Sequence, residues 1–124
     1  MIAKEITKCM GKPITQSRTE VNSAIHKTKV LIEQSNGAFD ENSDGYFDED
    51  IIMNKNGITK KIILEPIGLV LALLPYDFPV LEAILRLVPA VLAGNSVLLK
   101  SSKDTPMLAD MICSAFDDVA PGLV

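Results

Sequence analysis

Residues 65–106 read EPIGLVLALLPYDFPVLEAILRLVPAVLAGNSVLLKSSKDTP, and this stretch decides the fold. The apolar run from Ile67 to Leu74 has the length of one strand, whereas the apolar segment after the PYDFP turn, residues 80–93, has the length of a helix. Gly94-Asn95 ends that segment, and a second apolar run follows at residues 96–100. Strands without a polar face are typical of parallel sheets covered by helices, so the pattern predicts a β–α–β unit.

The connection in such a unit is expected to be right-handed. It would then bring the turn after Leu74 and the residues after Leu99 to the same carboxyl edge of the sheet. Ligands bind at that edge in open α/β sheets.

Helices are predicted on both sides of this unit. Apolar residues recur at helical spacing before Gly11, which predicts a first short helix. Residues 17–20, Ser-Arg-Thr-Glu, have the capping-box pattern for a second helix, although that helix could equally start nearer Thr15; residues 35–37 are expected to close it. Thr105-Pro106 predicts the start and cap of a last helix, and residues 121–124 are expected to lead into a third strand.

The middle of the chain combines an acidic loop with a predicted hairpin. Residues 40–50, DENSDGYFDED, follow the ligand spacing of an EF-hand loop, but Ile51 stands where that loop needs a bidentate glutamate. We therefore interpret this segment as a solvated acidic loop, with weak calcium attraction left open. Residues 50–53 and 58–64 flank an Asn-Gly pair, which is typical of a β-hairpin.

Composition excludes several classes of protein. A net charge of −4 with scattered basic residues argues against nucleic-acid binding. Cys9 and Cys113 have no metal-ligand spacing, so we expect two reduced thiols. His26 has no neighbouring ligand and is interpreted as a surface or boundary residue. No secretory signal is visible, and prolines and charges interrupt the apolar window at 67–92, so we expect a cytoplasmic chain without a membrane span.

Several motifs in register resemble the aldehyde dehydrogenase superfamily. They are PYDFP, VPAVLAGNSVLLK and KDTP, together with Gly11-Lys12-Pro13 and Pro66-Ile67-Gly68. The resemblance covers nearly the whole chain. It implies an α/β fold with a partial Rossmann-like parallel sheet, one βαβ unit, preceded by two helices and a β-hairpin. The implied domains are N-terminal helices at 1–36, an acidic loop with an oligomerisation-type hairpin at 37–65, and an incomplete dinucleotide-binding domain at 66–124.

The resemblance also implies cofactor-binding residues for NAD or NADP. Lys100 matches the lysine that contacts the adenosine ribose hydroxyls. Lys103 stands where many members carry an acidic residue that favours NAD, and a cation there tilts the expectation toward NADP. The family's floor and turn beside the nicotinamide correspond to Leu73, Leu74, Pro75 and Tyr76.

Asp77 occupies the position of the family's catalytic asparagine, whose amide N–H stabilises the oxyanion. An ionised aspartate offers only acceptors and a like charge, so this departure puts the catalytic role in doubt. The alternative interpretation of Asp77 is structural: it would cap the helix that begins near Phe78-Pro79.

Two functional hypotheses follow from the resemblance. In the first, the chain is a fragment of an NAD(P)-dependent aldehyde dehydrogenase, which oxidises an aldehyde to a carboxylic acid. The isolated chain would be inactive, because neither Cys9 nor Cys113 matches the nucleophile and the glutamate base is absent. In the second, it is a non-catalytic remnant that acts as an interaction or structural subunit. Either way, another chain or the missing remainder is expected to cover the sheet, and the aldehyde would be a substrate only of a complete enzyme.

Overall fold

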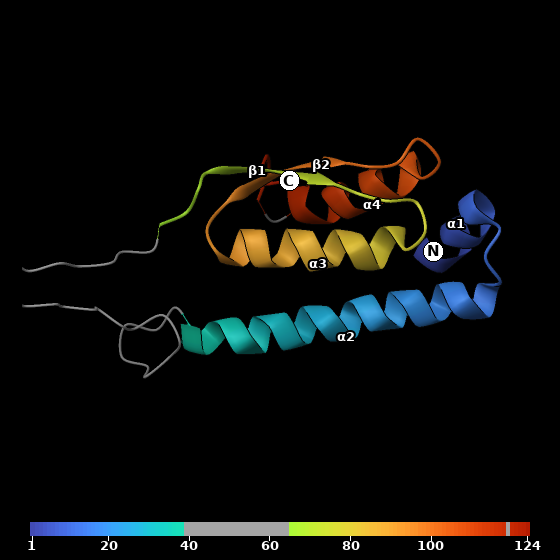
Figure 1. Cartoon of the computed structure of the whole chain (residues 1–124), viewed down its shortest axis with the longest axis horizontal. Helices are drawn as coiled ribbons and strands as arrows, with labels where there is room; N and C mark the ends of the chain where they lie inside the picture. The colour runs from blue at the N-terminus through green and yellow to red at the C-terminus, as the bar shows by residue number, and fades with distance from the viewer. Residues whose placement is uncertain (39–64, 119) are drawn as a thin grey trace, which may run out of the picture.

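The computed structural model describes residues 1–38, 65–118 and 120–124. Within these ranges the fold is α/β, with four helices and a two-stranded parallel sheet (Figure 1). The acidic loop at 40–50 and the hairpin predicted up to residue 64 lie outside the described residues. The elements in chain order are α1 (Ile2–Met10), α2 (Ile14–Ala38), β1 (Leu69–Leu73), α3 (Pro79–Leu92), β2 (Ser96–Lys100) and α4 (Pro106–Asp117).

The parallel β–α–β unit predicted from residues 65–106 is confirmed. In the register of β1 and β2, Leu69 lies opposite Ser96 and Leu73 lies opposite Lys100. The Leu74 N–H extends the ladder by donating to the Lys100 carbonyl over 2.9 Å. On the other edge of β2, the Val97 N–H donates to the carbonyl of Leu123 over 2.9 Å, so the segment predicted to lead into a third strand runs beside β2.

The Gly94-Asn95 pair joins the end of α3 to the start of both strands. Gly94 has a φ of 80°, and a Cβ there would lie 2.9 Å from the Cγ of Pro66. The buried Asn95 side chain accepts a hydrogen bond from the Gly68 N–H over 2.9 Å and donates one to the Ala90 carbonyl over 3.1 Å. These bonds fix where β1 begins relative to the last turn of α3.

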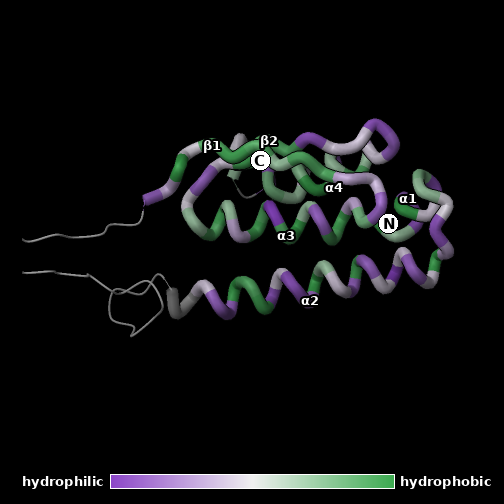
Figure 2. Tube along the Cα trace, in the orientation of Figure 1, coloured by the Kyte–Doolittle hydropathy of each residue, from purple (hydrophilic) through white to green (hydrophobic). Residues whose placement is uncertain are grey.

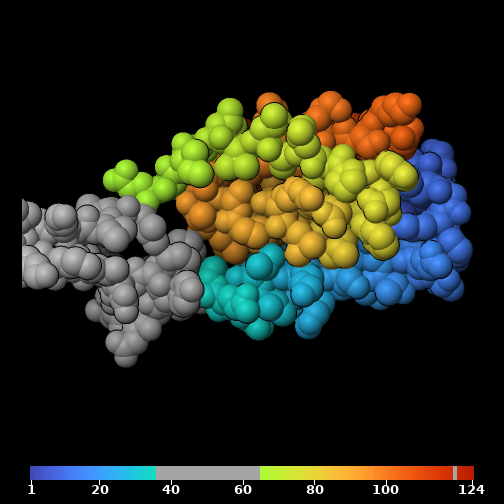
Figure 3. Space-filling model, in the orientation of Figure 1, coloured from blue at the N-terminus to red at the C-terminus, as the bar shows by residue number. Residues whose placement is uncertain are grey.

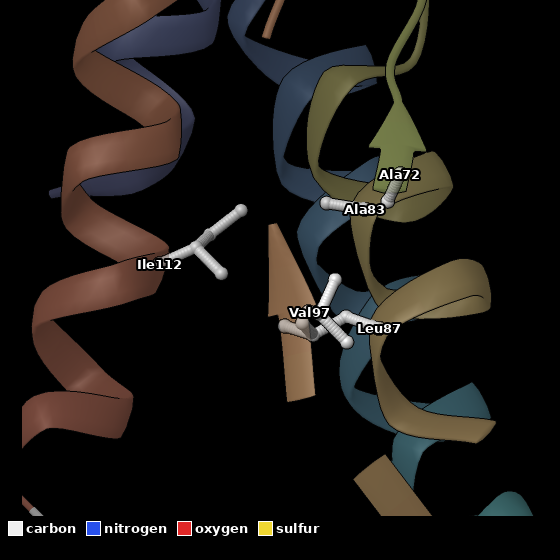
Figure 4. Close-up of a cluster of buried hydrophobic side chains, with 5 residues drawn as sticks. All are labelled: Ala72, Ala83, Leu87, Val97 and Ile112. Atoms are coloured by element: carbon white, nitrogen blue, oxygen red, sulfur yellow. The ribbon is translucent and has the colours of Figure 1, made fainter. Parts of the chain in front are cut away.

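Helices α3 and α4 cover one face of the sheet. Ile112 of α4 and Leu87 of α3 both point toward Val97 of β2 (Figure 4), in a cluster that also holds Ala72 and Ala83. Both strands are hydrophobic along most of their length (Figure 2). The opposite face carries four leucine side chains that are 57–67% exposed: Leu69, Leu71, Leu73 and Leu98. We call this set the open leucine face.

A second cluster joins the N-terminal helices to the β–α–β unit. Ile6 of α1, Ala24 of α2, Val80 of α3 and Leu108 of α4 are buried together. Helix α2 lies along α3, on the side of α3 that faces away from the sheet (Figures 1 and 3). The sheet, α3 and α2 therefore form successive layers, and α1 packs at one end.

The structure favours one of the two predicted starts of the second helix and corrects its predicted end. Helix α2 begins at Ile14, close to the alternative start near Thr15, so the capping box at residues 17–20 is wrong. Ser17 lies inside the helix, fully buried, and its hydroxyl shares a 2.9 Å hydrogen bond with that of Thr7 in α1. The helix also continues through Ala38, past Gly37, since one glycine costs a helix only about 1 kcal/mol and need not end it.

Helix α4 begins at Pro106 as predicted, but Thr105 makes no side-chain cap bond. Thr105 itself is buried at the start of the helix, with 1% of its surface exposed. In the described part of the chain, every helix is too short or too polar to span a membrane.

Candidate functional site

The carboxyl edge of the sheet carries most of the residues predicted to bind the cofactor. Leu73 and Lys100 lie opposite one another as the last paired residues of β1 and β2. Leu74 turns inward and packs against the core, while the side chains of Tyr76 and Asp77 are exposed in the turn that follows. One edge therefore brings together the backbone of residues 73–77 and the Lys100 side chain.

Lys100 and Lys103 supply positive charge on the β2 side of this edge. The exposed Lys100 ammonium donates one hydrogen bond to the Ser101 carbonyl over 2.6 Å. An ammonium group has three N–H donors, so further donors remain for hydroxyl or phosphate oxygens of a ligand. Lys103 is exposed in the loop between β2 and α4, three residues beyond Lys100.

The start of α3 is capped by a residue of α2. Pro79 has no N–H, and the Val80 and Leu81 N–H groups donate to Oε1 of Glu20 over 3.0 and 3.4 Å. The next amide, that of Glu82, donates to the Phe78 carbonyl over 2.9 Å. The glutamate thus satisfies two of the amides that a helix start leaves free, those of Val80 and Leu81.

The structural role predicted for Asp77 is therefore wrong. The N-cap position belongs to Phe78, and no side-chain cap bond is made there. The Glu20 carboxylate already occupies the place where a local capping group would sit. As a result, the Asp77 side chain is exposed at the carboxyl edge of β1.

Lys12 connects the capping carboxylate to the turn. Its Nζ lies 2.6 Å from Oε2 of Glu20, donates to the backbone carbonyl of Asp77, and lies 3.9 Å from the ring centroid of Phe78. The Lys12 side chain is 15% exposed and that of Glu20 only 1%. A buried carboxylate requires a counter-charge and hydrogen bonds, and Lys12 with the two amides of α3 supplies them.

Sequence reasoning missed this network of Lys12 and Glu20. Glu20 was assigned to a capping box within its own helix, and Lys12 was noted only as part of a motif. Their partners on α3 and its turn lie 60 and 65 residues away along the chain. No local spacing connects residues so distant, so the sequence carried no signal for the pairing.

Neither cysteine has the surroundings of a nucleophile. Burial raises the pKa of the Cys9 thiol, and Glu5, whose Oε1 lies 3.5 Å from Sγ, raises it further. Burial also raises the pKa of Cys113, assisted by the charges of Asp110 and Asp117. Reactive cysteines need a lowered pKa, and the shift at both thiols is in the opposite direction.

Metal binding has no candidate among the residues that the structure describes. No three His, Cys, Asp or Glu side chains there lie close enough together to hold an ion. His26 is exposed on α2, in agreement with its interpretation as a surface residue.

These features define an α/β protein whose candidate site lies at the carboxyl edge of a parallel sheet. The chain belongs to the aldehyde dehydrogenase family, whose family model matches residues 1–124. The resemblance drawn from the PYDFP and VPAVLAGN motifs is thus confirmed.

Curated relatives give the same family. The chain is 30% identical to a succinate semialdehyde dehydrogenase [NAD(P)+] of Escherichia coli, with 94% of this chain covered, and 33% identical to an N-succinylglutamate 5-semialdehyde dehydrogenase of Legionella pneumophila, with 99% covered. It spans only 23% of the length of each of these two relatives. A shorter match, 45% identical over 43% of this chain and 11% of the relative, is to a D-glyceraldehyde dehydrogenase (NADP(+)) of Picrophilus torridus.

Proposed function

We propose that this chain is a section of an NAD(P)-dependent aldehyde dehydrogenase, which oxidises an aldehyde to a carboxylic acid. The observation that carries the proposal is the parallel register that sets Leu73 opposite Lys100. A dinucleotide lying across this edge would have its nicotinamide near residues 73–76 and its adenosine ribose near the Lys100 ammonium. The section's part in the reaction is therefore to bind and orient the dinucleotide.

The isolated chain is expected to bind without turnover. When bound, the dinucleotide supplies the hydride acceptor, but covalent aldehyde oxidation also needs a reactive thiolate. The raised pKa values of Cys9 and Cys113 leave neither thiol suited to that step. The nucleophile and the base would come from the remainder of the enzyme.

The charge of Lys103 favours NADP over NAD. Its exposed ammonium lies in the loop after β2, where the ribose 2′ position would approach, and a cation there attracts a 2′-phosphate. Two of the relatives reported above carry NAD(P)+ or NADP(+) in their names, which supports a cofactor of this kind.

Calorimetric titration of the purified chain tests the binding role. We expect saturable heat with NADP+, weaker binding of NAD+, and loss of both in Lys100→Ala. Lys103→Glu should reverse the preference between the two dinucleotides. Lys29→Ala removes an exposed lysine of α2 and serves as the matched control. No saturable heat with either dinucleotide would reject the proposal.

Asp77 permits a test of the catalytic consequence in a longer protein. The chain would replace the section that it matches in the Escherichia coli relative, and aldehyde oxidation by the chimera would be measured. Because an anion replaces an oxyanion donor, Asp77→Asn should raise kcat by about 100-fold or more. Asp104→Asn, at another exposed aspartate, is the control. An equal kcat for the chimera with and without the Asp77→Asn substitution would contradict the assignment of position 77.

The alternative function, a non-catalytic interaction subunit, is favoured by the open leucine face. Its four side chains are 57–67% exposed, and contiguous apolar surface of this kind marks interaction sites. This function predicts a stoichiometric complex with a partner protein and no affinity for either dinucleotide. Leu71→Asp together with Leu98→Asp, at paired positions of this face, should then abolish the complex.

A further inference from the structure

The turn at residues 76–78 is held by charged residues from the other end of the chain. Glu20 of α2 accepts hydrogen bonds from the Val80 and Leu81 amides, immediately after the turn. Lys12, from the link between α1 and α2, binds the same carboxylate at 2.6 Å. Both residues are distant from the turn in the sequence and contact it only in the folded chain.

Lys12 also touches the turn directly, at two points. Its ammonium donates to the Asp77 carbonyl and lies 3.9 Å from the ring centroid of Phe78. The backbone of residue 77 is therefore fixed on one side by Lys12, and the helix that follows is fixed by Glu20. Since Lys12 is 15% exposed, water competes little for these contacts.

The origin of the cap matters for the site. An aspartate just before a helix ordinarily caps it with its own carboxylate. Here Glu20 does so instead, which leaves the side chain at position 77 exposed at the edge. A cap supplied by another helix thus frees position 77 to face a ligand.

We propose that Lys12 and Glu20 are positioning residues, which cap α3 from outside and hold the turn 76–78 so that the side chain of residue 77 projects into the site. This inference rests on the proposed function only in assigning the turn to the dinucleotide edge. Stability alone does not account for the pair, because replacing a buried ion pair by apolar residues is often neutral or stabilising. A local cap by Asp77 would satisfy the same amides without burying two charges.

Nuclear magnetic resonance of the full chain labelled with ¹³C and ¹⁵N tests the inference. In the unmodified chain we expect a scalar coupling across the hydrogen bond between the Val80 amide nitrogen and the Glu20 carboxyl carbon. In Lys12→Met, the amide resonances of residues 76–78 should shift or broaden at a temperature where circular dichroism shows an unchanged helix content. Lys12→Arg should restore most of the original positions.

Two further variants separate positioning from general stability. Glu20→Ala should speed hydrogen exchange of the Val80 amide by about tenfold or more, while the amide of Leu87 in the middle of α3 changes only with global stability. Lys8→Met is the matched control, because it removes the exposed Lys8–Glu5 pair on α1 and should leave the turn unchanged.

The outcomes distinguish this inference from the proposed function. Unmoved turn resonances in Lys12→Met, or absence of the Val80 coupling in the unmodified chain, would overturn the positioning role even if a dinucleotide binds. If the turn resonances shift in Lys12→Met and return in Lys12→Arg, the positioning role is supported, even when calorimetric titration detects no binding of either dinucleotide. If Glu20→Ala fails to fold, the coupling in the unmodified chain and the Lys12 pair of variants still decide the question.

Discussion

Replacing Asn95 with alanine should destabilise the chain by about 2 kcal/mol, because two links between α3 and β1 are lost. The Gly68 N–H would lose the oxygen that accepts it at 2.9 Å. Gly68 is exposed and this bond is only partly buried, so water can replace the lost acceptor and the loss costs roughly 1 kcal/mol. The lost bond from Nδ2 to the Ala90 carbonyl adds no more than about 1 kcal/mol, because that carbonyl also accepts the backbone N–H of residue 95 over 3.0 Å.

Urea denaturation followed by circular dichroism at the helix minimum measures this change. A loss of about 2 kcal/mol is a sizeable part of the roughly 5–15 kcal/mol that keeps a domain folded. It should lower the melting temperature by about 8 °C for a chain of this size. Asn22→Ala, at an exposed position of α2, is the matched control and should change stability by less than about 0.5 kcal/mol. If Asn95→Ala behaves like this control, the two hydrogen bonds do not fix the start of β1.

Three further measurements test other features. Gly94→Ala should destabilise the chain more than Gly11→Ala. Both glycines have a positive φ, which costs about 1–2 kcal/mol for alanine, but only at Gly94 would the new Cβ also strike the ring of Pro66. Equal losses of stability in urea titrations would contradict this. Leu87→Ala should cost about 3 kcal/mol, whereas Leu98→Ala on the open leucine face should cost under about 1 kcal/mol; similar values would mean that the face is covered. Because burial raises the pKa of Cys9, its reaction with a disulfide reagent at pH 8 should be slower in the native chain than in urea, measured with the other cysteine replaced by serine; equal rates would refute this.

The same rise in pKa sets the sign of a pH effect. A thiol with a higher pKa in the folded state keeps its proton when the unfolded chain has already lost one. The contribution of this thiol to folding stability is therefore fully present below its pKa in the unfolded chain, which is near 8.5. That contribution is lost as the pH rises through the pKa of the thiol in the folded chain. Stability should decline with pH above about 9, and by less when Cys9 is replaced by serine.

Local patterns predicted the central part of the fold correctly. The sequence pattern predicted a strand, a helix and a second strand from the apolar run at 67–74, the turn after it and the Gly94-Asn95 stop. The structure has all three elements in that order. Their parallel register also followed, because a strand without a polar face must be covered by helices. Helix ends were predicted less well: α2 begins before its apparent capping box and continues past Gly37.

The candidate site was likewise predicted correctly in one part and wrongly in another. Residues 73–77 and Lys100 were placed on one edge by strand order alone, and the structure brings them there. The capping role of Asp77 was wrong because a second helix supplies a better-placed carboxylate from Glu20. That competition depends on how α2 lies against α3.

The sequence by itself determined the element types and the sheet edge at which residues 73–77 and Lys100 meet, since these follow from the periodicity of apolar residues and from turn residues close together in the chain. Its motifs, by their resemblance to known members, identified the family. Tertiary structure alone decided which groups hold the turn. Lys12 and Glu20 meet residues 77–81 only after α2 has packed along α3. Their pairing is fixed by the burial of charge between two helices, and burial has no signature in local spacing.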